Sequence, residues 1–152
     1  MDDRLFKSAM GKFATGVTVV TTEVDEEVHG MTANAFMSVS LEPKLILVSV
    51  ANKARMNELI KESGYFAVNI LSDAQEDMSN YFAGMVKEKW ELDFDRFESQ
   101  PVIKDSIATI ACKVYDTHAA GDHTLYIGEV LNLEVKDGSP LAYFEGKYRG
   151  IQ

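Results

Sequence analysis

The sequence predicts a mainly β protein, an antiparallel barrel with helices on its outside. Two observations support this fold class. Runs of β-branched, aromatic and aliphatic residues recur along the chain and are separated by turn-forming residues, which is typical of strands. These runs do not alternate regularly with helical segments, as they would in a doubly wound parallel sheet. The 152 residues contain no internal repeat and no linker, so we expect a single domain over residues 1–152.

Most of the expected strands are short runs with a clear β pattern. Residues 17–22 are almost entirely β-branched, and the acidic turn at residues 23–27 makes them the first arm of a hairpin. Residues 45–50 are apolar apart from Ser49, a pattern typical of a buried strand. The full set of expected strands covers residues 17–22, 28–31, 45–50, 65–71, 107–115, 124–135 and 141–144.

Helical spacing of apolar residues marks two segments in the first half of the chain. Residues 4–13 and 54–62 each place their apolar side chains on one face, which predicts two amphipathic helices. Gly64 then provides a C-terminal stop for the second of them.

A third helix is expected after the strand at residues 65–71. Ser72 or Asp73 supplies a side chain suited to an N-cap, and the helix is expected to run to about Phe82. The segment that follows, residues 84–106, is charged and weakly patterned, so we expect an excursion from the barrel with a short helix at most.

Composition excludes several function classes. The net charge of −9 argues against a nucleic-acid partner, because phosphate contacts need a basic surface. No apolar stretch approaches the roughly 20 residues that span a bilayer, and the acidic start of the chain has no hydrophobic signal core, so we expect a cytoplasmic protein. Cys112 is the sole cysteine, which excludes an internal disulfide; its apolar neighbours predict an inert buried thiol.

The familiar catalytic motifs are absent from the sequence. It contains neither a Gly-x-Gly-x-x-Gly segment nor a phosphate-binding loop that ends in Gly-Lys-Ser/Thr. It also lacks a Gly-x-Ser-x-Gly elbow, and its three histidines do not have helical metal-ligand spacing. We therefore expect no metal site, and although the chain contains Ser, His and Asp, no motif displays the nucleophile of a triad.

The most informative segment is residues 30–40, where small hydroxyl and amide side chains stand between two β-forming runs. Thr32, Asn34, Ser38 and Ser40 supply short hydrogen-bonding groups, and the small residues among them let a ligand approach the backbone. Such a surface suits a flat, polar-edged ligand that bears a phosphate. From these residues alone, a half-buried strand with a polar solvent face is an equally good interpretation.

Three further features are ambiguous when each is taken alone. Lys53 and Arg55 form a small basic spot in an acidic chain, which suits an anion or is simply solvated surface. His123 follows Gly121 and Asp122, so it is either a turn residue or a functional group at a barrel rim. Tyr148 lies between two glycines near the C-terminus.

Taken together, these segments resemble the flavin reductase-like family, whose members have an FMN-binding split-barrel fold. Their order and spacing carry the resemblance more than any single motif does, and residues 84–106 carry it least. The matching segments are residues 13–22, 30–40, 66–71, 121–124 and 140–148.

The resemblance implies an antiparallel split β-barrel that forms a homodimer, with each flavin in a groove near the subunit interface. The implied activity is reduction of FMN or FAD by NADH or NADPH, and the implied partner is a separate monooxygenase that consumes the reduced flavin. Hydride transfer between two cofactors needs little catalytic apparatus from the protein, which agrees with the absent motifs.

The resemblance also assigns residues to the flavin. The isoalloxazine ring would lie against Thr32, Ala33 and Asn34. The ribityl chain and the approach to the phosphate would lie along Ser38, Val39 and Ser40.

Four more residues are implied around the same ligand. Lys53 and Arg55 would contact the phosphate, although this part of the match is loose. His123 would lie beside flavin and nicotinamide as the catalytic residue, and it would either orient the carboxamide or carry positive charge. Tyr148 would close over the site.

Two other functions are compatible with the same sequence. One is a flavin-binding electron-transfer protein without NAD(P)H reductase activity of its own. The other is a small barrel that binds a different, apolar ligand. Reduction of bound flavin by NADH distinguishes the first from an enzyme, and failure to bind FMN or FAD indicates the second.

Overall fold

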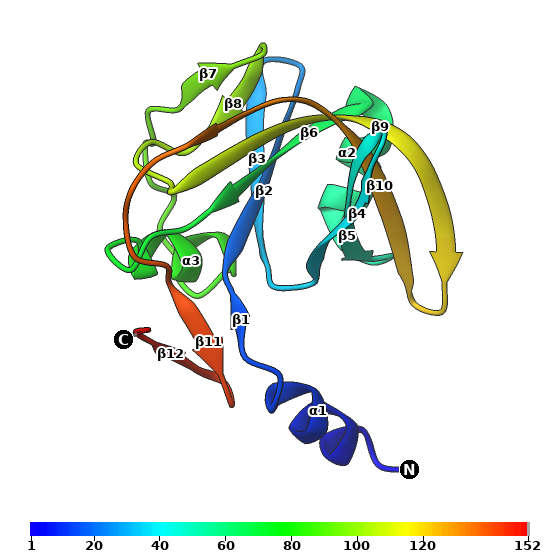
Figure 1. Ribbon diagram of the computed structural model, residues 1–152, viewed down its shortest axis with the longest axis vertical. Coiled ribbons are helices and arrows are strands. Elements are labelled where there is room, and N and C mark those ends of the chain that lie inside the picture. Colours follow the sequence, from blue (N-terminus) through cyan, green and yellow to red (C-terminus); the bar gives the residue numbers. More distant parts are fainter. Residues whose placement is uncertain (152) are drawn as a thin grey trace.

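The computed structural model describes residues 1–151 and is built on a seven-stranded antiparallel sheet (Figure 1). The strand order is β3-β2-β6-β9-β10-β5-β4, and every neighbouring pair is antiparallel. These strands are β2 (Thr18–Val24), β3 (Glu27–Ala33), β4 (Phe36–Leu41), β5 (Lys44–Ala51), β6 (Tyr65–Ile70), β9 (Ala108–Ala120) and β10 (His123–Val135).

Chain connectivity forces this sheet to curl. The edge strands β3 and β4 are consecutive in the sequence and are joined by Asn34 and Ala35 alone. A flat sheet would separate its two edges by six strand spacings, about 29 Å, whereas the three Cα steps of this link span at most about 11 Å. The sheet therefore closes at the link into a barrel, and the expected split-barrel fold class is confirmed.

Smaller strands and the helices lie at one end and on the outside. The first small sheet has the order β1-β11-β12, and β7 pairs with β8 in a hairpin. These strands are β1 (Thr15–Gly16), β7 (Asp95–Phe97), β8 (Gln100–Val102), β11 (Ala142–Phe144) and β12 (Lys147–Arg149). The helices in the described residues are α1 (Asp3–Gly11), α2 (Arg55–Ser63) and α3 (Glu76–Phe82).

The first two helices agree with their sequence signals. Asp2 caps α1 by accepting a hydrogen bond from the Arg4 amide at 2.6 Å. Gly64 ends α2 in a left-handed conformation (φ 76°), and its amide donates to the Ile60 carbonyl at 2.8 Å. No residue of α1 is buried, and the helix projects from the barrel (Figure 1).

In the middle of the chain one expectation is wrong and another is incomplete. The N-cap of α3 is Gln75, because Ser72 and Asp73 belong to the preceding turn, where the Ser72 amide donates to Gln75 Oε1 at 2.9 Å. Within residues 84–106 the structure contains the β7–β8 hairpin and no helix. Arg96 of this hairpin forms a bidentate ion pair with Glu23 of β2, which holds the segment against the barrel.

The barrel core lies on the inward faces of the strands and under α2. On β5, Ile46, Val48 and Val50 are buried, whereas Leu47 and Ser49 between them are half-buried on the outer face. The three buried residues belong to the larger of two core clusters, which also contains Cys112, and burial raises the pKa of the Cys112 thiol to about 12. The prediction of an inert buried thiol agrees with this environment.

The strands β9 and β10 are the longest in the sheet. Each has 13 residues, and β9 continues to Ala120, five residues past its expected end. Residues 115–120 of β9 are exposed, whereas β10 pairs with β5 from His123 to Glu129 and is buried or half-buried there. Among residues 1–151 there is no helix long and apolar enough to cross a membrane.

Candidate functional site

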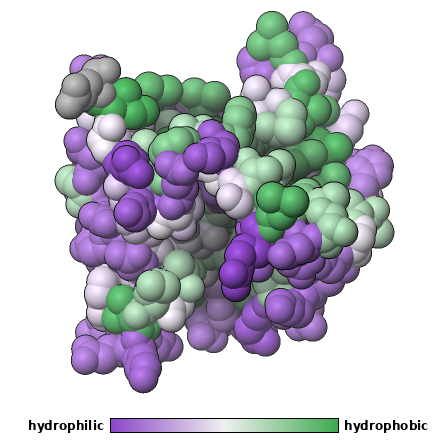
Figure 2. All heavy atoms as spheres, turned by 90° about the horizontal axis from the view of Figure 1, so that it is seen from below, coloured by the Kyte–Doolittle hydropathy of each residue, from purple (hydrophilic) through white to green (hydrophobic). Residues whose placement is uncertain are grey.

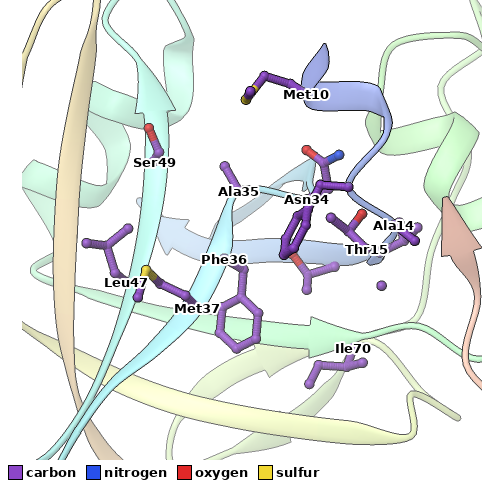
Figure 3. Close-up of a pocket in the computed structure, with 14 residues that line it drawn as sticks. Met10, Ala14, Thr15, Asn34, Ala35, Phe36, Met37, Leu47, Ser49 and Ile70 are labelled. Atoms are coloured by element: carbon purple, nitrogen blue, oxygen red, sulfur yellow. The ribbon is translucent and has the colours of Figure 1, made fainter. Parts of the chain in front are cut away.

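The main pocket is a cavity of about 830 Å³ on the outer face of the sheet. It lies where the β3–β4 link passes β5, and the β1 segment and α1 form its opposite wall (Figure 3). This volume falls within the range of small-molecule sites. The lining residues are Met10, Phe13–Thr18, Asn34–Met37, Leu47, Ser49 and Ile70.

Three local features produce this hollow. Ser49 donates its amide to the Ala35 carbonyl at 3.1 Å, which fixes the β3–β4 link against β5. Gly16 lacks a side chain where an added Cβ would meet nothing within 4 Å, so the space stays open. The third feature is α1, which contributes Met10 alone to the lining. Viewed from the end where α1 lies, hydrophobic side chains are visible on the surface (Figure 2).

Few polar groups face this mainly apolar pocket, and one of them has no partner. Thr18 Oγ1 donates to the Ala33 carbonyl at 2.7 Å. Thr15 Oγ1 is buried and has no hydrogen-bond partner within residues 1–151. A buried hydroxyl without a partner costs free energy, so Thr15 is a group to which a ligand can offer a hydrogen bond.

A smaller side pocket of about 200 Å³ adjoins the main one and shares Val17 and Asn34 with it. It brings together four of the residues expected at the flavin, namely Thr32, Ala33, Asn34 and Tyr148.

Tyr148 and Thr32 are both fastened to α3 at the side pocket. Thr32 Oγ1 donates to the Ser79 carbonyl at 2.6 Å, and the Tyr148 hydroxyl lies 2.6 Å from Ser79 Oγ and donates to Asn80 Oδ1 at 3.1 Å. Tyr148 is therefore a fixed wall of the side pocket in this structure. Sequence reasoning missed Ser79, because nothing in its neighbourhood distinguishes it from an ordinary helix residue.

His123 begins β10 and lies on the same side of the sheet as the main pocket. It pairs with Ala51 of β5, and Leu125 pairs with Ser49. Paired residues share a face and alternate residues along a strand do too, so His123 faces outward with Ser49. Its Nδ1 is 2.8 Å from Asp122 Oδ1, which leaves Nε2 as the nitrogen available to a ligand.

The two basic candidates are separated by the structure. Lys53 lies in the β5–α2 link near the His123 turn. The hydrogen bond from His123 chiefly, with Lys53 as a lesser contributor, holds the pKa of Asp122 below its usual value. Arg55 opens α2 and lines a different pocket of about 290 Å³, together with Glu58 and Glu62. Carboxylates around a cation weaken its attraction for a phosphate.

The residues expected along the ribityl chain lie on the edge strand β4. Ser38 pairs with Ile46 and Ser40 with Leu45, so Val39 between them is the extra residue of a bulge. All three lie outside the lining of the main pocket, which Met37 of the same strand does reach.

Comparison with known proteins identifies the family. The family model of the flavin reductase like domain matches residues 10–152, and the chain belongs to this family. An NADH-dependent flavin reductase from Rhodococcus sp is 43% identical over 149 residues, which cover 96% of this chain and 85% of the relative.

Two further relatives agree with this assignment. The reductase component of 4-hydroxyphenylacetate 3-monooxygenase from Thermus thermophilus is 39% identical over 147 residues, covering 96% of this chain and 95% of that protein. Among solved structures, the flavin reductase PheA2 superimposes with a TM-score of 0.98 at 55% identity and covers 100% of this chain and 99% of its own. The resemblance seen in the sequence is thereby confirmed, and with it the oxidoreductase class.

Proposed function

We propose that this chain is an NADH-dependent flavin reductase that binds the flavin ring in the main pocket. The observation that carries this proposal is the apolar cavity of about 830 Å³ at the β3–β4 link. Asn34 lines it, and Thr32 and Ala33, the other two residues expected at the ring, line the adjoining side pocket. Its apolar walls match the faces of an isoalloxazine, and Asn34 and the unpartnered Thr15 hydroxyl match its polar edge. When bound, the flavin itself supplies the hydride-accepting chemistry.

In this proposal each group of residues has a distinct task. Thr32, Ala33 and Asn34 position the ring, and the contacts of Thr32 with α3 keep that wall rigid. Tyr148 closes the inner end of the side pocket. Binding both rings in contact is the protein's main contribution to a transfer between cofactors.

His123 contacts the nicotinamide in the proposed arrangement. Asp122 accepts from Nδ1, which leaves Nε2 for the ligand. The imidazole orients the carboxamide when neutral and adds positive charge beside the reduced flavin when protonated. The pH dependence of hydride transfer distinguishes these two roles.

The phosphate is assigned to the end of the site that carries Lys53. Ser38 and Ser40, with Val39 between them, remain proposed along the ribityl chain, although they pair with the Leu45–Ile46 end of β5 and Lys53 follows its opposite end. Arg55 is the second cation proposed from the sequence. We rank Lys53 above Arg55, because Lys53 lies beside the His123 turn and Arg55 lies among carboxylates. FMN and FAD both fit this assignment.

A homodimer completes the proposal. Large apolar side chains are exposed on α1, on β4 and on the last residues of β10, where a monomer would leave them in water. A second copy that covers α1 also closes the open wall of the main pocket and excludes water from it. The exposed side chains are Leu5, Phe6, Met10, Met37, Leu41, Leu131 and Leu133.

We propose that a separate monooxygenase consumes the reduced flavin. This partner is suggested by the Thermus relative, which is named as the reductase component of such an enzyme. NADH is the proposed donor, NADPH is the alternative, and the cytoplasm is the proposed location.

An anaerobic stopped-flow experiment tests the function directly. The protein loaded with FMN is mixed with NADH, and the visible absorbance of the flavin is followed. Rapid bleaching is expected. A flavin that binds but stays oxidised with both NADH and NADPH would instead identify an electron carrier, and failure to bind FMN and FAD would remove the flavin site altogether.

A further inference from the structure

A buried hydrogen-bond network lies directly behind His123 and Lys53, on the inward side of the sheet. Its centre is Asn57 of α2, whose exposed fraction is 4%. The Asn57 side-chain amide faces Thr124 Oγ1 at 3.2 Å and Asn52 Oδ1 at 3.3 Å. The hydroxyl of Tyr126, which is fully buried, donates to the side-chain and main-chain oxygens of Asn57.

This network joins the two turns that carry the proposed ligand contacts. Thr124 Oγ1 donates to Asn52 Oδ1 at 2.7 Å, and the Asn52 amide donates to the Asp122 carbonyl at 2.9 Å. Asn52 precedes Lys53 and Thr124 follows His123, so each bonded residue is the immediate neighbour of a proposed site residue. The β5–α2 link and the β9–β10 turn are therefore held as one unit.

We propose that Asn57 is a positioning residue that holds Lys53 and His123 in one fixed arrangement. The inference rests on the proposed function of these two residues. Asn57 itself touches no ligand; it acts by bonding at once to the exposed Asn52 of one turn and the buried Thr124 of the other. A fully satisfied buried network permits one arrangement, because any other leaves donors or acceptors unpaired in a dry environment.

The chain contains a matched control for this role. Asn69 of β6 is fully buried and equally well bonded, since its amide donates to the Val19 carbonyl at 2.9 Å and its oxygen accepts from the Ile103 amide at 2.9 Å. It joins β2 and β6 to the segment after β8 and bonds to none of the proposed site residues. Its loss is expected to lower stability alone.

The test compares Asn57→Ser with Asn69→Ser in the full chain. Dissociation constants are measured for FMN and for riboflavin, and anaerobic hydride transfer is measured at saturating flavin. Asn57→Ser is expected to reduce the preference for FMN over riboflavin and the transfer rate by roughly tenfold each, the low end for residues that orient a ligand-binding group. Asn69→Ser is expected to leave both quantities unchanged.

Double variants show whether Asn57 acts through its two neighbours. In a Lys53→Ala background, Asn57→Ser is expected to cause no further change in the preference for FMN over riboflavin. In a His123→Ala background, it is expected to leave the transfer rate unchanged. Additive effects in either background, or equal effects of Asn69→Ser, would overturn the proposal.

Two further measurements separate this inference from the proposed function. If Asn57→Ser does not fold, Tyr126→Phe removes one donor to Asn57 and is expected to act in the same direction. The NMR signals of the His123 ring report its ordering without any flavin, and they are expected to broaden in Asn57→Ser and to stay sharp in Asn69→Ser. Wild-type protein that neither binds nor reduces flavin rejects the function, whereas an active wild type with a silent Asn57→Ser rejects this inference alone.

Discussion

The two faces of the β5–β10 pair carry different kinds of residue. Val48 and Tyr126, which pair across the two strands, are both fully buried in the core. The next pair, Ser49 and Leu125, is half-buried on the outer face, where Ser49 lines the main pocket. Because strand side chains alternate, residues next to one another in sequence serve stability and ligand binding separately. Substitutions at neighbouring positions are therefore expected to separate the two properties.

The largest effect is expected on the inward face, at Gly128. A Cβ added there would lie 2.6 Å from Phe66 Cζ and 2.9 Å from Cys112 Cβ, both in the core. Gly128→Ala is expected to lower the free energy of unfolding by about 1–3 kcal/mol, as overpacking does elsewhere. Urea unfolding measures this. Gly16→Ala is the control, since its Cβ meets nothing within 4 Å; an equal loss of stability in both variants would contradict the comparison.

On the outer face, His123→Ala is expected to separate activity from folding. The ring is exposed and its hydrogen bond is to the exposed Asp122, so the unfolding free energy should change by less than about 0.5 kcal/mol. Flavin affinity should be retained, while hydride transfer should fall about tenfold or more, because the nicotinamide loses a positioning contact. Flavin titration measures the affinity, and stopped-flow kinetics measure the hydride transfer. Weaker flavin binding with unchanged transfer per bound flavin would be the contrary result.

Thr15 combines the two properties, because its hydroxyl is buried and the residue also lines the main pocket. Replacing its buried, unpartnered hydroxyl by a methyl group in Thr15→Val is expected to raise the unfolding free energy of the flavin-free protein by about 1 kcal/mol. Flavin affinity is expected to fall in the same variant, because the ligand loses a hydrogen bond. Thermal unfolding with and without flavin reveals both changes. A Thr15→Val protein with lower stability and unchanged affinity would show that the hydroxyl has a structural role.

Lys53 and Arg55 are the two cations proposed for the flavin phosphate, and their substitution compares their contributions to FMN binding. Lys53→Ala is expected to weaken FMN binding roughly threefold to tenfold more than riboflavin binding, in line with one partly exposed charge contact. Arg55→Ala should have a smaller effect on this ratio, because its side chain faces carboxylates. Fluorescence titration with the two flavins decides the ranking. A larger effect of Arg55→Ala would place the phosphate at the start of α2.

The smallest effect is expected at the ion pair of Glu23 and Arg96, which lies on β2 and β7, outside the β5–β10 strand pair. The hydrogen bond from Arg96 lowers the pKa of Glu23, so this pair stabilises the fold above about pH 5, and the contribution is lost as the pH falls through the lowered pKa. Glu23→Gln is expected to cost about 0.5 kcal/mol at pH 7, since the pair is largely exposed, and nothing at acid pH. Urea midpoints at both pH values test this; a loss independent of pH would point to packing.

Local sequence signals predicted where helices and strands lie better than they predicted which residues surround them. Residues 54–62 and Gly64 predicted α2 and its end, because amphipathic spacing and a left-handed glycine act locally. The same spacing places Glu58 and Glu62 on the face of Arg55. It did not reveal that Asp25 and Glu27 line the same pocket, since the neighbours of a helix face are set by the fold.

The site was predicted in part for the same reason. The small residues at 32–34 do line the pockets, whereas the opposite wall from Phe13 to Thr18 read as ordinary helix end and strand. The polar residues at 38–40 lie on a bulged edge strand, and a bulge depends on pairing with β5 that periodicity does not show.

The link of Asn34 and Ala35 has a mechanical consequence. It is the point at which the barrel closes, yet no ladder joins β3 to β4 within the described residues. A ring bound in the main pocket touches the link, β5 and the β1 segment at once. Occupancy of the site therefore bridges the discontinuity of the barrel, and amide hydrogen exchange along both edge strands is expected to slow as ligand is added.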